Sequence, residues 1–217
     1  MQLTTEQIEC INQTLIGKGI KFDDIKLEVL DHIATEIENE MEVSNNNFPI
    51  VYNQVFENWS EEFKLTRNFF SIQSPYPKLV HSKLTNQFKK EVIIALVSSI
   101  VLIISFQFVA AAQGKLQFLR IINDVLFYTY FTIAAAGLLI KLWNFKSKAT
   151  STYKHLFDSR FTFLIVFLSV VIRSSIPQDL TNQNLYVATI SCLFVFLLSI
   201  IYLGMKHIQF QRKFSIQ

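Results

Sequence analysis

The sequence predicts an all-α protein, in which a cytoplasmic three-helix N-terminal domain precedes a four-helix transmembrane bundle. About half of the 217 residues are apolar, and after residue 91 they gather in long runs that are typical of membrane spans. Before residue 71 the apolar residues recur at helical spacing instead. The charge is divided as well, because residues 1–77 carry 13 acidic and 5 basic side chains, whereas residues 78–217 carry 4 acidic and 15 basic ones.

The N-terminal domain is predicted to occupy residues 1–70. Its first helix should be capped by Thr4 or Thr5 and should end near Ile16, before Gly17 and Gly19. The second helix should begin with Asp23 or Asp24 as its cap and run to about residue 41. Its apolar stripe is predicted to comprise Leu27, Leu30, Ile33, Ala34, Ile37 and Met41.

A third helix should follow the break at residues 45–47, with Asn47 as its cap and Pro49 in its first turn. Residues 71–91 are predicted to form a linker and a basic juxtamembrane segment, whose lysines should lie along the inner membrane surface or in the first turns of a span. The apolar stripe of the third helix is predicted to comprise Tyr52, Val55, Phe56, Trp59, Phe63 and Phe70.

The transmembrane domain is predicted at residues 92–204, followed by a basic cytoplasmic tail at residues 205–217. The third span is the shortest in strictly apolar residues, because only Phe161–Ile172 lack charge, and Arg160 and Arg173 lie near its ends. The four spans are predicted at about residues 92–112, 121–142, 157–176 and 185–203.

Loop charges predict the orientation. With four spans and a cytoplasmic N-terminus, 12 basic residues near the membrane lie inside and 3 outside, as the positive-inside rule requires. The N-terminus has neither the basic nor the apolar region of a signal peptide. We therefore expect a multi-pass protein of a bacterial cytoplasmic (inner) membrane, with both termini in the cytoplasm.

Several functions are disfavoured by what the sequence lacks. The acidic N-terminal domain argues against binding of nucleic acid, which needs clustered basic residues. The cores of the spans contain no Asp, Glu, Lys, Arg or His, and proton or ion pathways usually need such a group. Motifs of hydrolases, zinc proteases and nucleotide-binding enzymes are absent from the sequence, so no catalytic residue and no cofactor is predicted.

Glu28, His32 and Glu36 are the candidate metal ligands, because spacing of four residues places them on one helix face. The alternative is a solvated polar surface, since no cysteine or second histidine lies nearby in the sequence. His32 and its neighbour Asp31 are also candidates for interaction, through hydrogen bonds within or between helices.

Other interaction candidates lie in the spans. Residues 134–137 read Ala-Ala-Ala-Gly, and small residues such as Ala134 and Gly137 allow another helix to approach closely. Asp124 and Arg173 both fall near outer ends of spans, where they would form an ion pair or a shallow outer binding site.

The segment Leu-Glu-Val-Leu-Asp-His-Ile at residues 27–33, which follows an opening Thr-Thr-Glu-Gln-Ile-Glu helix, resembles uncharacterised small multi-span membrane proteins of bacteria. The three-helix layout is also similar to the HAAS signalling domain, which is associated with PadR-type regulators. The resemblance covers about residues 4–65. It implies a membrane-bound regulatory or interaction module.

Three functions follow, in this order of preference. The first is a non-enzymatic regulatory or scaffold protein, with membrane lipids around it and a cytoplasmic protein partner or a second copy bound to it. The second is a small transporter or transporter subunit, with uncharged residues such as Gln107 and Thr132 along its route. The third is an enzyme that acts on lipid and uses His32 or His155.

Overall fold

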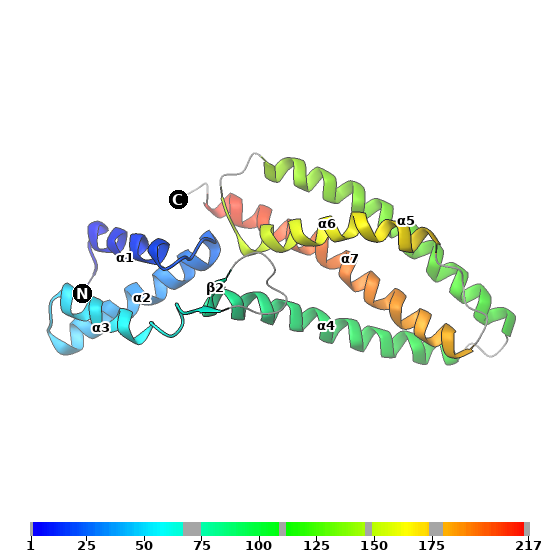
Figure 1. Cartoon of the computed structure of the whole chain (residues 1–217), viewed down its shortest axis with the longest axis horizontal. Helices are drawn as coiled ribbons and strands as arrows, with labels where there is room; N and C mark the ends of the chain where they lie inside the picture. The colour runs from blue at the N-terminus through cyan, green and yellow to red at the C-terminus, as the bar shows by residue number, and fades with distance from the viewer. Residues whose placement is uncertain (1, 67–74, 109–111, 146–148, 174–179, 215–217) are drawn as a thin grey trace. The chain divides into compact units, whose positions relative to one another are not determined.

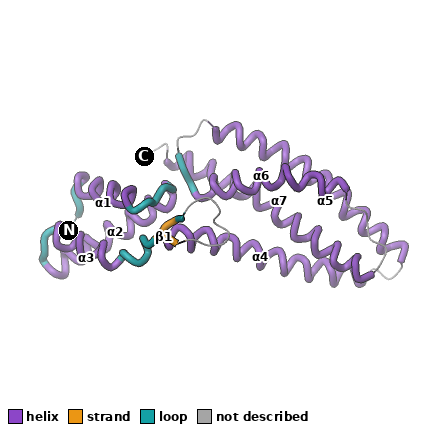
Figure 2. The backbone as a smooth tube through the Cα atoms, in the orientation of Figure 1, coloured by secondary structure: helices purple, strands orange, loops and turns teal. Residues whose placement is uncertain are grey.

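The computed structural model describes residues 2–66, 75–108, 112–145, 149–173 and 180–214. Over these residues the chain is almost entirely helical, with one short pair of strands, as Figure 2 shows. It divides into two compact units. The first unit comprises residues 1–86 together with 149–152, and the second comprises residues 87–148 and 153–217.

The first helix, α1 (Thr5–Gly17), begins with a capping box. The Thr4 hydroxyl accepts a hydrogen bond from the Gln7 amide (3.3 Å), and the Gln7 side chain accepts one from the Thr4 amide (2.8 Å). Thr4, rather than Thr5, is therefore the cap. Gly19 follows the helix with a φ of 86°, a left-handed conformation that glycine adopts without strain.

The next two helices, α2 (Asp23–Ser44) and α3 (Phe48–Asn58), meet at the predicted break. The cap position of α2 is Phe22, which makes no side-chain capping hydrogen bond, so the prediction of an aspartate cap was wrong. Asp23 and Asp24 lie inside the first turn instead. Asn47 occupies the cap position of α3 as predicted, although its side chain makes no capping hydrogen bond, and Pro49 lies in the first turn.

The core of the first unit lies between these three helices, which Figure 1 shows packed together. The buried row of α2 is centred differently from the predicted stripe. Ile25, Val29, Ile33 and Ile37 are buried at intervals of four residues, whereas Leu27 lies at the edge and is 36% exposed. The core also receives Ile11, Leu15, Ile20, Phe22, Val51, Val55, Phe56, Phe63 and Val80.

The chain after α3 differs from the prediction of a helix that continues to Phe70. Helix α3 ends at Asn58, and turns lead to strand β1 (Leu65–Thr66), which pairs antiparallel with β2 (Tyr76–Pro77). Phe70 lies outside the described residues. Helix α4 (Lys78–Gln107) starts directly after β2, and its Val80 is fully buried in the core of the first unit.

The second unit consists of the remaining length of α4 with α5 (Ala112–Phe145), α6 (Thr152–Arg173) and α7 (Leu180–Phe214). Helices α5 and α7 run side by side in Figure 1. The buried residues of this core come from α5, α6 and α7. They are Leu126, Tyr130, Ile133, Phe157, Phe161, Leu164, Ile190, Leu197, Ile200 and Leu203.

Three helical segments are long and apolar enough to cross a membrane, which indicates a membrane protein. They are Lys78–Gln107, Gly114–Phe145 and Asn182–Phe214. The second and third of these contain the predicted second and fourth spans, and the first covers the predicted first span up to residue 107. Helix α6 covers most of the predicted third span but is not among the three in the described part of the chain. The structure thus supports the all-α membrane class.

Candidate functional site

Two aspartates at the start of α2 hold the segment between α5 and α6. This segment, Ala149–Thr152, belongs to the first unit although it lies far along the chain. The Asp23 carboxylate accepts hydrogen bonds from the Thr150 amide (2.7 Å) and the Thr150 hydroxyl (2.9 Å). The Asp23 amide in turn donates to the Thr150 carbonyl oxygen (2.7 Å), so the two backbones pair at this point.

Asp24 holds the next turn of the same segment. One carboxylate oxygen accepts a hydrogen bond from the Thr152 amide (2.9 Å), and the other accepts one from the Thr152 hydroxyl. Thr152 is the first residue of α6, so the Asp24 carboxylate satisfies a free amide at a helix N-terminus, where negative charge is favoured. We name the set Asp23, Asp24, Thr150 and Thr152 the loop clamp.

Two lysines of the segment that was predicted to be juxtamembrane bind acidic residues within the first unit. Lys78 forms an ion pair with Glu62 (2.8 Å), and Lys83 forms one with Glu28. These two lysines are therefore engaged by acidic residues, and they lie in the first turns of α4, which is the second of the two predicted placements. Lys89 and Lys90 are exposed.

The candidate metal ligands have different partners. Glu28 binds Lys83, while Glu36 accepts a hydrogen bond from the Trp59 indole (2.8 Å). His32 and its neighbour Asp31 are exposed on α2. Among the described residues, no group of three or more histidine, cysteine, aspartate or glutamate side chains is arranged to hold a metal ion.

A buried ion pair joins three helices of the second unit. The Arg160 guanidinium of α6 contacts both carboxylate oxygens of Glu91 in α4, at 2.7 Å each, and donates to the Ser199 hydroxyl of α7 (2.9 Å). The side chains of Arg160 and Glu91 are only 8% and 14% exposed. A bidentate pair of this kind fixes the mutual position and rotation of the helices that carry it.

Sequence reasoning missed this pair, since it placed Arg160 at a span end with its charge reaching toward the lipid surface. The signal was available, because Glu91 is one of only four acidic residues after residue 77. A carboxylate that is buried at the edge of an apolar run is costly unless it pairs with a cation.

The small-residue patch of α5 packs inside the second unit. A Cβ atom added to Gly137 would lie 2.4 Å from Cε2 of Phe161 in α6, so only glycine fits there. Ala134 is half-buried against the same core. Asp124 is exposed on α5, and the side chain of Arg173 lies outside the described residues, so their predicted pairing is not described.

The polar residues proposed for a transport route bond within the second unit. The Gln107 side chain donates to the Asn184 side-chain oxygen (2.7 Å), and the Thr132 hydroxyl donates to the Thr129 carbonyl oxygen (2.9 Å). On α4 and α7, the hydroxyls of Ser98 and Ser191 lie 2.9 Å apart. These bonds are those expected of polar groups that help helices to pack.

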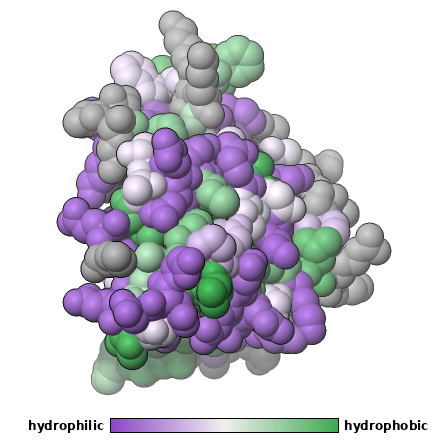
Figure 3. All heavy atoms as spheres, turned by 90° about the vertical axis from the view of Figure 1, so that its left-hand side faces the viewer, coloured by the Kyte–Doolittle hydropathy of each residue, from purple (hydrophilic) through white to green (hydrophobic). Residues whose placement is uncertain are grey.

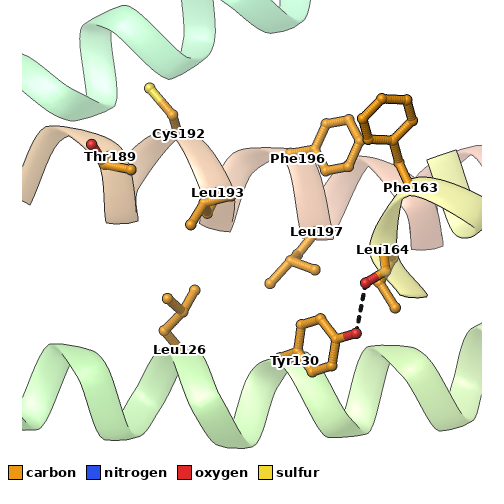
Figure 4. A pocket seen from close by; sticks show the side chains of 9 residues that line it. All are labelled: Leu126, Tyr130, Phe163, Leu164, Thr189, Cys192, Leu193, Phe196 and Leu197. Carbon is orange, nitrogen blue, oxygen red and sulfur yellow. Dashed lines mark hydrogen bonds between the residues drawn. The ribbon is translucent and has the colours of Figure 1, made fainter. Parts of the chain in front are cut away.

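An apolar pocket of about 370 Å³ opens between α5, α6 and α7. Figure 4 shows its lining residues, with the Tyr130 hydroxyl donating a hydrogen bond to the Leu164 carbonyl oxygen (2.7 Å). The lining residues are Leu126, Tyr130, Phe163, Leu164, Thr189, Cys192, Leu193, Phe196 and Leu197.

Comparison of the chain with protein-family models, with curated proteins and with solved structures finds no match. The loop clamp, the buried ion pair and the surfaces of the two units are therefore the features that bear on function.

Proposed function

We propose that this chain is a non-enzymatic regulatory or scaffold protein of the membrane, whose N-terminal unit binds a protein partner and relays that binding to the membrane helices. The loop clamp carries this proposal. It ties the N-terminal unit to the first residue of α6 through four hydrogen bonds to the carboxylates of Asp23 and Asp24. A partner that shifts α2 would therefore act on the first residue of α6.

The proposal includes four spans, with both termini in the cytoplasm of a bacterial cell. The chain leaves the first unit through α4 and returns to it after α5, which supports two spans in this stretch. The segment at residues 149–152 then shares a side with the N-terminal unit. The distribution of basic residues supports the assignment of that side to the cytoplasm, because 12 basic residues near the membrane then lie inside and 3 outside.

Helix α6 serves as the third span in this arrangement. Its Arg160 is paired with Glu91 and bonded to Ser199, so the charge at its cytoplasmic end is neutralised within the bundle. This pairing supports membrane insertion of a helix whose strictly apolar stretch is short.

The partner is expected to present a basic surface to the first unit. Residues 1–86 and 149–152, which form this unit, carry 13 acidic and 7 basic side chains, a net charge of −6, and hydrophilic side chains dominate the face of this unit in Figure 3. Complementary charge speeds association and selects partners. The resemblance to HAAS domains points to the same kind of role, and Asp31 and His32 are our candidates for the contact because both are exposed on α2.

Affinity purification from native membranes in mild detergent, with quantitative mass spectrometry, tests the proposal. The full chain is compared with an Asp31→Lys/His32→Ala variant, and Glu57→Lys serves as the control because it reverses an exposed charge on α3. We expect a stoichiometric protein partner that is lost from the first variant and kept by the control. A chain that purifies alone from all three preparations overturns the proposal.

A further inference from the structure

The pocket between α5, α6 and α7 differs from an ordinary ligand site in having no free polar group on its described lining. Its volume of about 370 Å³ is within the range of about 300–1,000 Å³ that is usual for small-molecule sites. Such sites normally combine an apolar wall with a few polar groups that orient the ligand.

The polar atoms of the lining side chains are engaged within the protein. The Tyr130 hydroxyl donates to the Leu164 carbonyl oxygen, and the Thr189 hydroxyl donates to the Leu185 carbonyl oxygen (2.8 Å). The Cys192 thiol lies 3.5 Å from the Ser99 hydroxyl of α4, and in Figure 4 its sulfur points away from Leu126 and Tyr130. A ligand with hydrogen-bonding groups would lose its contacts with water and gain none here.

The environment of the pocket indicates which apolar molecules can reach it. Helices α5 and α7, which supply seven of the nine lining residues, are both long and apolar enough to cross a membrane. Phe163 and Thr189, on the pocket's wall, are exposed, so the pocket is accessible from outside the unit. In a bilayer, the medium outside this part of the helices is hydrocarbon.

We propose that this pocket binds one acyl chain of a membrane phospholipid. The chain fills the space between α5, α6 and α7 with methylene groups, which match a wall that offers only dispersion contacts. The proposal goes beyond the regulatory function and rests only on insertion of α5 and α7 into a membrane.

The test uses the full chain reconstituted with a phospholipid that carries a photoreactive diazirine near the end of one acyl chain. After illumination, the labelled peptides are identified by mass spectrometry. Two variants fill the pocket, Leu193→Trp and Thr189→Phe. The matched control is Leu198→Trp, because Leu198 lies on the same helix, is exposed and does not line the pocket.

We expect labelling to concentrate on the lining residues of α5 and α7. It should fall about tenfold in both filled variants, which corresponds to about 1.4 kcal/mol of binding free energy, and should persist in the control. Thermal unfolding of each variant shows whether it is folded, and Thr189→Phe changes an exposed position, so it gives a readout if Leu193→Trp unfolds.

Labelling that is equally strong on the exposed apolar face of α4, at Ile93, Val97 and Ile100, and that ignores the filling substitutions, would reflect general lipid contact and overturn the proposal. Loss of labelling in the control to the same extent would overturn it as well. Neither result depends on whether a protein partner co-purifies, so the two proposals fail separately.

Discussion

At the scale of single residues, Gly137 sets how closely α5 approaches α6. Its position leaves no room for a side chain, because a Cβ atom would lie 2.4 Å from the ring of Phe161. That ring is held in place, since it is 4% exposed and stacks on Phe157 with centroids 5.7 Å apart. The contact explains why a small residue is needed on this face of α5 without invoking a second chain.

We predict that Gly137→Ala lowers the free energy of unfolding by about 1–3 kcal/mol, the usual cost of overpacking a core. The measurement is unfolding of the purified chain in mixed micelles with an increasing share of denaturing detergent. Gly17→Ala is the matched control, because an added Cβ there meets no atom within 4 Å. An equal effect of both changes would show that the contact with Phe161 is not responsible.

The Glu91–Arg160 pair gives a second prediction at this scale. Glu91→Gln leaves the guanidinium of Arg160 buried without its counter-ion, so stability should fall by about 3–5 kcal/mol. The control is Asp158→Asn, which removes a more exposed ion pair with Lys141 (3.8 Å) and should change stability by less than about 1 kcal/mol. Similar losses in the two variants would contradict the role given to the buried pair.

At the scale of elements, the start of α6 depends on a residue more than 120 positions earlier in the chain. Asp24→Ala removes the acceptor of the Thr152 amide and hydroxyl, and loss of such a cap costs about 1 kcal/mol. We predict faster amide hydrogen exchange in the first turn of α6, with little change elsewhere. Asp31→Ala, which removes an exposed acid from the same helix, should leave that exchange unchanged.

The elements themselves could largely be predicted from the sequence. The helices of the first unit and the apolar lengths of α4, α5 and α7 follow from local periodicity and composition, which act over a few residues. The buried face of α2 was predicted in the wrong place. Leu27 and Val29 are both apolar, and only packing of α2 against α1 and α3 decides which of the two is buried.

The candidate site could not be predicted in the same way. Asp23 and Asp24 have the sequence context of helix caps, and their use for Thr150 and Thr152 depends on a contact across most of the chain. The pairing of Glu91 with Arg160 likewise depends on the tertiary fold, because the sequence offers several other basic residues as partners. The sequence shows that these residues are charged, whereas the fold determines which partner each of them binds.

At the scale of the whole molecule, the two cysteines report the orientation. Cys10 is exposed on α1 in the first unit, and Cys192 lies in the apolar length of α7. We predict that a polar, membrane-impermeant maleimide labels Cys10 only after the cells are lysed. A Cys192→Ser variant assigns the signal to Cys10. Labelling of that variant in intact spheroplasts would place the N-terminal unit outside and contradict the proposed topology.

The division of the first unit between residues 1–86 and 149–152 has a consequence for biosynthesis. Thr150 leaves the ribosome about 64 residues after Asn86, which is a delay of roughly 3–13 s at about 5–20 residues per second. During that interval the rest of α4 and all of α5 are translated, while the carboxylates of Asp23 and Asp24 remain without their threonine partners. Completion of the N-terminal fold therefore reports that the two apolar helices α4 and α5 have been synthesised, and a fragment that stops at residue 86 lacks a segment of its own unit.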